Sequence, residues 1–372
     1  MKRLLFFFII FSATIGYAQE TEFAAIDNNM LYIPKVSTNS TSGIATFINS
    51  SYKKEKEKCR AAYKWVTYNI KYDTDSMYVF NWGGDPERKI TDALRRRKGV
   101  CENYAAIFNE ILIKCGIQSY VVSGYTKQSG YIQKNGHSWC AVNIDAEWLL
   151  CDPTWDEAYT SNANYFLVVP SKFIESHMPF DPLWQLIDHP ISQLQFYTGN
   201  FYTGKGAAIF NYNDSVKTFL QMNELQQLEA TSRRMREAGI SNEQTRLRLT
   251  FTEMQASIIY ETKDMNDYNA AVDDLNKARN IFNDFVQYRN KQFMPVRPDA
   301  EMNKLLSPIE ALLIAAEKKL DEVDKSLVNA QYDTRDLRIE LNNFRAKLQK
   351  QQVFLKKYLV GGEAERKKMF YN

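Results

Sequence analysis

Apolar residues in the first half of the chain change from a helical spacing to a strand-like spacing near residue 116. The helical spacing predicts four helices, over residues 41–48, 54–68, 85–98 and 101–115. The strand-like spacing then predicts three strands, over residues 120–123, 137–144 and 147–151. Helices that precede an antiparallel sheet in this way predict an α+β domain.

The turn between the last two strands determines which side chains share a face of the sheet. If Asp145-Ala146 is a two-residue turn, Cys140 lies opposite Cys151 on one face. His137 and Asp152 then lie on the other face as diagonal neighbours, about 7–8 Å apart at the backbone and within reach of each other. A slip of one residue would place them on opposite faces, so this prediction depends on the length of the turn.

The second half of the chain carries a heptad pattern of apolar residues, with alternating steps of four and three. One series covers Leu247–Leu275, and a second covers Leu313–Tyr358, where the polar positions are Thr334 and Gln351. This pattern predicts two helices of roughly fifty residues each, about 75 Å long, that share an apolar seam.

Two arrangements of these helices fit the pattern. The break at residues 292–306 contains Pro295 and Pro298 and favours an antiparallel hairpin, with residues 214–238 as a third helix. A parallel dimer through the second helix alone is the competing arrangement. The predicted fold class is therefore an α+β core followed by an all-α coiled-coil or helical-hairpin domain.

Length and composition agree with more than one folded domain. The chain has 372 residues, more than one typical core, and 45% of them are apolar and 13% aromatic. We expect a signal peptide at residues 1–18, an α+β core with an irregular C-terminal segment at residues 19–212, and a helical domain at residues 213–372.

Residues 1–18 have the three parts of an export signal. Lys2 and Arg3 are followed by the apolar run Leu4–Phe11 and by the small residues of Gly16-Tyr17-Ala18. The apolar run is shorter than the about 20 residues that span a bilayer. We therefore expect an exported protein, periplasmic or secreted, without a membrane span. Removing two basic and no acidic residues lowers the net charge from +3 to +1, which argues against a nucleic-acid partner.

Three residues offer the parts of a thiol acyl-transfer site, namely a nucleophile, a base and an orienting carboxylate. Cys101 begins a predicted helix, where free backbone amides and the helix dipole stabilise a thiolate. His137 opens one predicted strand and Asp152 ends the next. The alternative is that Cys101 is a small buried residue that packs the start of its helix. The basic run Arg95–Lys98 is either a solvated helix end or a set of charges that favours the thiolate or attracts acidic substrates.

Five cysteines leave at least one without a partner inside the chain. We expect Cys101 to be a free thiol. The other four are either buried thiols or two disulfides, and they are Cys59, Cys115, Cys140 and Cys151.

Three ordered motifs around these residues resemble the transglutaminase-like superfamily, whose fold is distantly papain-like. The motifs are Gly99-Val-Cys-Glu-Asn-Tyr-Ala105, Gly136-His-Ser-Trp139 and Trp148-Leu-Leu-Cys-Asp-Pro-Thr-Trp155. The resemblance covers about Thr41 to Pro190, because similarity to bacterial members extends upstream through Trp65–Tyr72 and downstream through Phe173–Leu186. It implies that Cys101 is the nucleophile, that His137 is the general base and acid, and that Asp152 orients the imidazole.

The resemblance gives no match for the oxyanion donor. The backbone amide of Cys101 is a candidate on physical grounds, and the side chains of Trp65, Tyr72 and Trp82 are others. Animal cross-linking members depend on calcium. Here Asp73-Thr-Asp75-Ser lacks the glycine and the closing glutamate of an EF-hand loop and predicts a turn.

We expect neither a metal nor another cofactor. No pair of cysteines or histidines has the spacing of zinc ligands. His177 and His189 lie in proline-flanked segments, where a structural or packing role is expected.

These features favour an exported cysteine hydrolase that acts on amide bonds of proteins or peptides through a Cys-His-Asp triad. One alternative is an inactive peptide-binding module, with the C-terminal helices as an arm for self-association or partner docking. The other is a protein cross-linking acyltransferase, because hydrolysis and cross-linking share the same acyl-enzyme.

Overall fold

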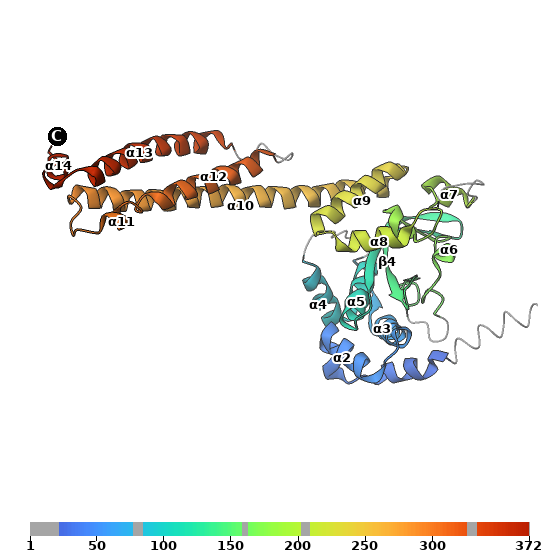
Figure 1. Cartoon of the computed structure of the whole chain (residues 1–372). Coiled ribbons are helices and arrows are strands. Elements are labelled where there is room, and N and C mark those ends of the chain that lie inside the picture. Colours follow the sequence, from blue (N-terminus) through green and yellow to red (C-terminus); the bar gives the residue numbers. More distant parts are fainter. Residues whose placement is uncertain (1–21, 77–84, 158–162, 202–208, 326–332, 372) are drawn as a thin grey trace, which may run out of the picture. The chain divides into compact units, whose positions relative to one another are not determined.

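A computed structural model describes residues 22–76, 85–157, 163–201, 209–325 and 333–371 of the chain (Figure 1). The chain divides into two compact units, Met1–Glu253 and Met254–Asn372. Residues 1–18, interpreted above as an export signal, lie outside the described residues. Among the described residues, no helix has both the length and the apolar character needed to span a membrane.

Four helices of the first unit form where the apolar spacing predicts them. They are α2 (Thr41–Ser51), α3 (Glu55–Asn69), α4 (Pro86–Arg96) and α5 (Cys101–Lys114). The Asp85 side chain caps α4 by accepting a backbone hydrogen bond, and Pro86 takes the first helical position. Helix α4 ends before Gly99, its expected end, because Arg97 adopts a left-handed conformation with φ of 52°. Gly116 follows α5 with φ of 82°.

A four-stranded antiparallel sheet follows these helices, which confirms the α+β prediction for the core. The strands are β3 (Ser119–Gln128), β4 (Tyr131–Ile144), β5 (Glu147–Cys151) and β6 (His177–Pro179), in the order β5-β4-β3-β6. Cys140 pairs with Cys151, which is the register that a two-residue turn predicts. Asp145 and Ala146 both take positive φ values, 52° and 68°, as a type I′ turn requires.

Each face of the sheet has its own apolar core. Helices α2 to α5 cover one face, where they pack against Cys140, Val142 and Cys151. On the other face, Trp139 and Leu150 pack against the segment after β5 and against two later helices. The segment after β5 includes α6 (Pro170–Phe173) and the 3-10 helix η2 (Pro182–Gln185), and the two helices are α8 (Tyr212–Gln221) and α9 (Glu224–Ala238).

The four cysteines that were open to either interpretation are free thiols. Cys140 and Cys151 face each other across two strands without a disulfide. The Cys140 thiol lies 3.2 Å from the carbonyl oxygen of Ala105, and the Leu167 N–H donates to the Cys151 sulfur at 3.2 Å. Burial raises the pKa of Cys140, as it does that of Cys59. These thiols therefore act as small buried residues.

Residues 214–238, expected as a third helix of the C-terminal hairpin, lie in the first unit instead. They form most of α8 and α9, whose residues Val216, Phe219 and Ala230 join the core on the second face of the sheet. Arg234 of α9 also makes a two-contact ion pair with the buried carboxylate of Asp181, at 2.7 and 2.6 Å. An apolar stripe on a short helix shows that one face is buried, but not against which partner.

In the part of the second unit that the structure describes, three long helices form a bundle with one apolar core. These are α10 (Glu243–Asn290), which begins in the first unit, α12 (Ser307–Lys325) and α13 (Arg335–Val360), with the short helices α11 (Asp299–Met302) and α14 (Glu363–Lys368). The core contains the predicted seam residues Leu275, Leu313, Ala316, Leu320, Leu337, Leu341, Phe344, Leu348 and Leu355. Arg338 pairs with Asp321 and Arg345 pairs with Glu310, so α12 and α13 run antiparallel.

The first long helix is confirmed by α10, with 48 residues, but the prediction of a second unbroken helix is wrong. That segment folds back on itself as α12 and α13. The buried Thr334, just before α13, donates a hydrogen bond to Asp324 at 2.7 Å. The heptad pattern could not show this, because both arms of a hairpin keep the same apolar positions on one core. Two predicted seam residues, Leu327 and Ala330, lie outside the described residues.

Candidate active site

Cys101 occupies the first position of α5, as the sequence predicts. Strand β1 (Lys71–Tyr72) pairs in parallel with β2 (Lys98–Gly99) and brings the chain to this helix start. The Val100 N–H donates to the side chain of Asn103 at 3.0 Å, which satisfies one of the free amides there. A Cβ atom on Gly99 would lie 2.6 Å from the Cβ of Asn103, so this turn requires glycine. The Cys101 side chain is partly exposed.

The basic residues before Cys101 are engaged by carboxylates. Arg96 and Lys98 both pair with the buried Asp73, at 2.5 and 2.9 Å, and Lys98 also pairs with Asp75 at 2.9 Å. The hydrogen bond from Lys98 is the main reason that the pKa of Asp73 lies well below its usual range. Residues 73–76 form the expected turn, closed by the Ser76 N–H and the Asp73 carbonyl. These charges stabilise the turn, and the structure gives no support to their role in substrate attraction.

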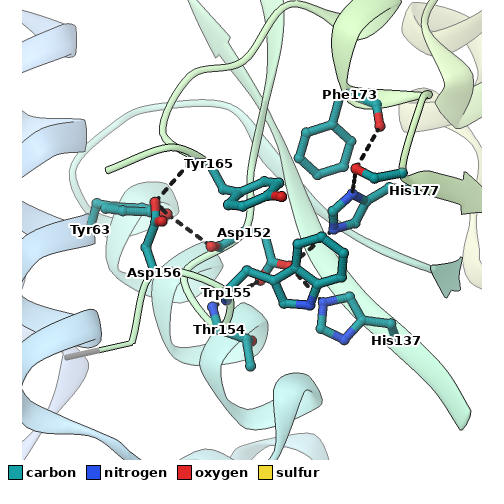
Figure 2. Close-up of polar contacts among 10 residues, drawn as sticks. Tyr63, His137, Asp152, Thr154, Trp155, Asp156, Tyr165, Phe173 and His177 are labelled. Atoms are coloured by element: carbon teal, nitrogen blue, oxygen red, sulfur yellow. Dashed lines mark hydrogen bonds and ion pairs between the residues drawn. The ribbon is translucent and has the colours of Figure 1, made fainter. Parts of the chain in front are cut away.

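His137 and Asp152 lie together as the strand register predicts. The Nε2 atom of His137 is 2.6 Å from the Oδ2 atom of Asp152 (Figure 2). The Asp152 side chain is completely buried. Its other oxygen, Oδ1, accepts hydrogen bonds from the backbone N–H groups of Thr154 and Trp155, at 2.8 and 3.3 Å.

His177 joins this pair, which the sequence did not reveal. Its Nε2 atom lies 3.1 Å from the same Oδ2 atom of Asp152, and its Nδ1 atom lies 2.7 Å from the Ser176 hydroxyl. The ring is buried between Phe173 and Trp155, with centroid distances of 4.0 and 4.3 Å. It packs as expected but also contacts the carboxylate. Strand β6, which carries His177, has three residues and is too short to leave an alternating pattern.

The two imidazoles differ in charge although they share one carboxylate. Burial disfavours the charged form of His137, but the charge and hydrogen bond of Asp152, with help from Cys101, raise its pKa to about 10. Burial dominates at His177 and lowers its pKa to about 4, despite the hydrogen bond to Asp152. Burial alone would raise the pKa of Asp152, but His137 and His177 hold it well below its usual range.

These pKa values define the hydrogen bonds of the cluster near neutral pH. His137 is an imidazolium paired with the Asp152 carboxylate. His177 is neutral, so its Nε2–H donates to Asp152 while its Nδ1 accepts from the Ser176 hydroxyl. One carboxylate thus holds a charged and a neutral ring at the same time.

The same three side chains could also be considered as metal ligands, because their donor atoms lie within 4.8 Å of one another. The 2.6 Å between Nε2 of His137 and Oδ2 of Asp152 is a hydrogen-bond distance. Two ligands on one tetrahedral zinc ion, each at about 2.0–2.2 Å, lie more than about 3 Å apart. The geometry therefore fits a shared proton better than a metal.

A second buried carboxylate, Asp156, fixes the loop that carries Asp152. The Tyr63 hydroxyl of α3 lies 2.6 Å from Asp156 Oδ2 and 2.8 Å from the Asp152 carbonyl oxygen. Asp156 also accepts from the backbone N–H group of Asn164 at 3.1 Å. It accepts another hydrogen bond from the backbone N–H group of Tyr165 at 2.8 Å (Figure 2). Burial raises the pKa of Asp156. Neither Tyr63 nor Asp156 was predicted to support the site.

Gly124 of β3 makes room for the cluster. It pairs with His137 on one side and with Pro179 on the other. A Cβ atom here would lie 2.1 Å from the Met178 carbonyl oxygen and 2.5 Å from the Trp139 indole. The strand that carries His177 can approach β3 only because this position is glycine.

Cys101 contributes to the raised pKa of the His137 imidazole, which indicates that the two side chains lie near each other. The contact between His137 and Asp152 is the part of the predicted triad for which the structure gives a distance. Of the predicted oxyanion donors, Trp65 is fully buried beneath Arg97, with the guanidinium 5.0 Å from the ring centroid. Trp82 lies outside the described residues.

Comparison with known proteins agrees with this geometry. Residues 43–153 match the family model of the transglutaminase-like superfamily. This part of the chain belongs to that superfamily. The match includes the positions of Cys101, His137 and Asp152.

Several curated proteins are similar to the transglutaminase-like region. Kyphoscoliosis peptidase of Mus musculus is 32% identical over 165 residues, which cover 39% of this chain and 24% of that protein. Lim and transglutaminase domain protein ltd-1 of Caenorhabditis elegans is 24% identical over 208 residues, which cover 48% of this chain and 28% of that protein. The alignments thus span about a quarter of the length of these relatives.

Proposed function

We propose that the first unit is a cysteine hydrolase that cleaves amide bonds of proteins or peptides. The observation that carries this proposal is the 2.6 Å contact between His137 and Asp152, on an imidazole that also responds to Cys101 at the start of α5. A thiol beside an imidazolium and at a helix N-terminus reacts as a thiolate. The similarity to kyphoscoliosis peptidase supports a hydrolytic reaction.

The proposed reaction has two halves. The Cys101 thiolate attacks the carbonyl carbon of an amide, and His137 gives its proton to the departing amine, which leaves an acyl-enzyme. His137 then takes a proton from water, the resulting hydroxide attacks the acyl carbon, and the carboxylic acid departs from the sulfur. Asp152 holds the imidazole in place through both halves, and the backbone N–H of Cys101 is the candidate donor to the oxyanion.

The C101A variant tests this proposal. Parent protein and variant are incubated with a peptide library, and new amino termini are measured by mass spectrometry. We expect cleavage by the parent and none above background by the variant. A C115A variant serves as control. It loses the thiol that directly follows the C-terminal end of α5, and we expect it to cleave like the parent. Equal cleavage by parent and C101A would contradict the proposed mechanism.

Two further measurements separate the alternatives. An amine tracer that becomes attached to peptides would show acyl transfer in place of hydrolysis, because an amine then replaces water in the second half. An inactive binding module would react with a thiol-directed acylating probe no faster at Cys101 than at the buried Cys115.

The proposal includes export, on the basis of the signal-like residues 1–18. Fractionation of cells and sequencing of the mature N-terminus test it, with cleavage expected after residue 18. The second unit is proposed as an arm for self-association or partner docking, which sedimentation of the whole chain tests.

A further inference from the structure

A cavity of about 210 Å³ lies in the first unit between the sheet and the two helices that follow it. Residues Tyr120–Ser123 of β3 line one side, and Trp184 of η2 lines another. Thr231 of α9 and Arg248 of α10 complete the wall. The volume is below the about 300–1,000 Å³ of sites for drug-sized ligands, so it suits one side chain or one chain end.

This cavity begins next to the proposed catalytic cluster. Ser123, which lines it, precedes Gly124, and Gly124 pairs with His137 across the sheet. Phe180 also lines it, directly after β6, and the Phe180 N–H donates to the Ser123 carbonyl oxygen at 3.0 Å. Beyond this bond β6 ends. At Tyr120–Val122, the edge of β3 that faces away from β4 therefore has no strand partner among the described residues. A bound peptide could therefore meet both a strand edge and the catalytic cluster.

Three charged residues line the cavity, namely Asp181, the exposed Glu224 and the partly buried Arg248. Asp181 is neutralised by the two-contact ion pair with Arg234. For Arg248, the described part of the chain provides neither a hydrogen bond nor an ion pair to the guanidinium, whose aromatic contact is the Phe251 ring at 5.8 Å. Glu102, the residue after Cys101, acts on Arg248 through its charge but is itself paired with Lys89 at 2.9 Å.

A partly buried cation without a carboxylate partner is costly for a folded protein. Burial lowers the pKa of Arg248, which shows that water solvates the guanidinium poorly. An anion that enters the cavity would relieve this cost, and a planar guanidinium binds carboxylates through two parallel hydrogen bonds. Tyr120 and Ser123 also line the cavity and carry hydroxyl groups that could donate further hydrogen bonds, whereas the Thr231 hydroxyl already donates to Asp181 at 3.1 Å.

We propose that this cavity is a substrate subsite in which Arg248 binds a carboxylate of the peptide, either an acidic side chain or the free C-terminus. The subsite rests on the proposed function, because it assigns the cavity to the peptide that the catalytic cluster cleaves. It makes the enzyme prefer amide bonds close to a carboxylate.

Peptide binding to the C101A variant tests the subsite without turnover. The probes are fluorescein-labelled octapeptide pools with Glu or Gln at one fixed position and random residues elsewhere, each with a free or an amidated C-terminus. Fluorescence polarisation measures the affinity. We expect roughly tenfold or tighter binding of pools with the preferred carboxylate, because hydrogen bonds to charged groups have about this effect. The Glu and Gln pools report on the side chain, and the two ends report on the C-terminus.

Substitutions at Arg248 on the C101A background then assign the preference. R248Q is expected to remove it, whereas R248K retains part of it and shows that the site still folds. R246Q is the matched control, because Arg246 is an exposed residue of the same helix that pairs with Glu243 at 3.1 Å. It should keep the full preference.

Three results would overturn the subsite. They are no binding of any pool, equal binding of all four, or a carboxylate preference that survives R248Q. The failure of the proposed function is separate, because it appears as equal cleavage by parent and C101A. A carboxylate preference in binding together with such equal cleavage would leave the cavity as a peptide-binding site and remove only its catalytic role.

Discussion

Asp152 is the residue on which the candidate site depends most. One buried carboxylate accepts four hydrogen bonds, from the rings of His137 and His177 and from the backbone of Thr154 and Trp155. A buried charge is tolerated only when its hydrogen bonds are satisfied. Because all four directions are occupied, the carboxylate has one orientation, and so does the His137 ring. In the proposed mechanism, His177 is therefore a positioning residue that acts through Asp152.

Replacement of His177 by leucine should reduce turnover without weakening substrate binding. The H177L variant removes one donor from Asp152, so the carboxylate and the His137 ring lose their fixed orientation. We expect kcat to fall roughly tenfold to hundredfold, as for other residues that orient a catalytic group through a second contact, with KM unchanged. Steady-state kinetics on a cleaved peptide measures both.

Two variants distinguish positioning from a general loss of structure. H177Q keeps a side-chain N–H that can reach Asp152 and should recover part of the activity. H189Q alters a histidine that makes no contact with the cluster and should behave as the parent. If H177L had the kcat of the parent, Asp152 would hold the imidazole without help from His177.

At the scale of elements, the pairing of β3 with β6 assembles the site. Strand β6 has only three residues, and it pairs with Gly124, Tyr125 and Thr126 of β3. This short pairing brings His177 to Asp152 across 25 positions of sequence. Strand β6 approaches so closely because Gly124 has no side chain.

The G124A variant should displace β6 and lower both stability and activity. The added Cβ would lie 2.1 Å from a backbone oxygen, so the strands must move apart. Forced repacking of this kind costs typically about 1–3 kcal/mol. Denaturant unfolding and peptide cleavage measure the two effects. G136A is the matched control in β4, because the nearest atom to the added Cβ is 3.6 Å away. It should change stability and peptide cleavage little. Parent-like behaviour of G124A would show that β6 does not position His177.

At the scale of the whole molecule, the two histidines make stability depend on pH in opposite directions. His137 has a raised pKa, so its contribution is complete below the usual imidazole value of about 6.5 and is lost as pH rises toward about 10. His177 has a lowered pKa of about 4, so the unfolded chain binds its proton more readily. Its contribution is complete above about 6.5 and is lost as pH falls toward 4.

The free energy of unfolding of the first unit should therefore fall between pH 6.5 and pH 4. His177 alone accounts for on the order of 2–3 kcal/mol of this loss, since each pKa unit corresponds to about 1.4 kcal/mol. Denaturant unfolding followed by tryptophan fluorescence at several pH values measures it. The H177Q variant has no such proton to bind and should show a flatter acid limb. An equally steep limb in H177Q would assign the loss to carboxylates.

The helical bundle should contribute to stability independently of the catalytic chemistry. Leu341 is 1% exposed in the shared core of α10, α12 and α13, and L341A should destabilise the bundle by about 2–5 kcal/mol. The exposed Ile339 on the same helix provides the control, because I339A should cost less than about 0.5 kcal/mol. Thermal unfolding measures both, and peptide cleavage should stay at the parent rate. A matching loss of cleavage in L341A would show that the two units are coupled.

The linear order of residues sufficed for features that follow short-range rules. A two-residue turn and the alternation of a strand placed His137 beside Asp152, and a glycine before an apolar helix placed Cys101 at a helix start. The same local rules predicted α2 to α5 and the length of α10. Each of these depends on neighbours within a few positions, where backbone geometry leaves few choices.

Long-range packing determined the features that local patterns did not predict, namely the supporting residues of the site and the partners of the helices. His177, Tyr63 and Asp156 reach the site from segments up to 93 residues apart, along paths that no local pattern encodes. The heptad pattern of α12 and α13 is equally compatible with one straight helix and with a hairpin. The apolar stripes of α8 and α9 show that one face is buried but do not determine which surface buries it. Burial of an apolar face is favourable against any apolar surface. The tertiary structure alone therefore determines which surfaces meet and which polar groups become buried together.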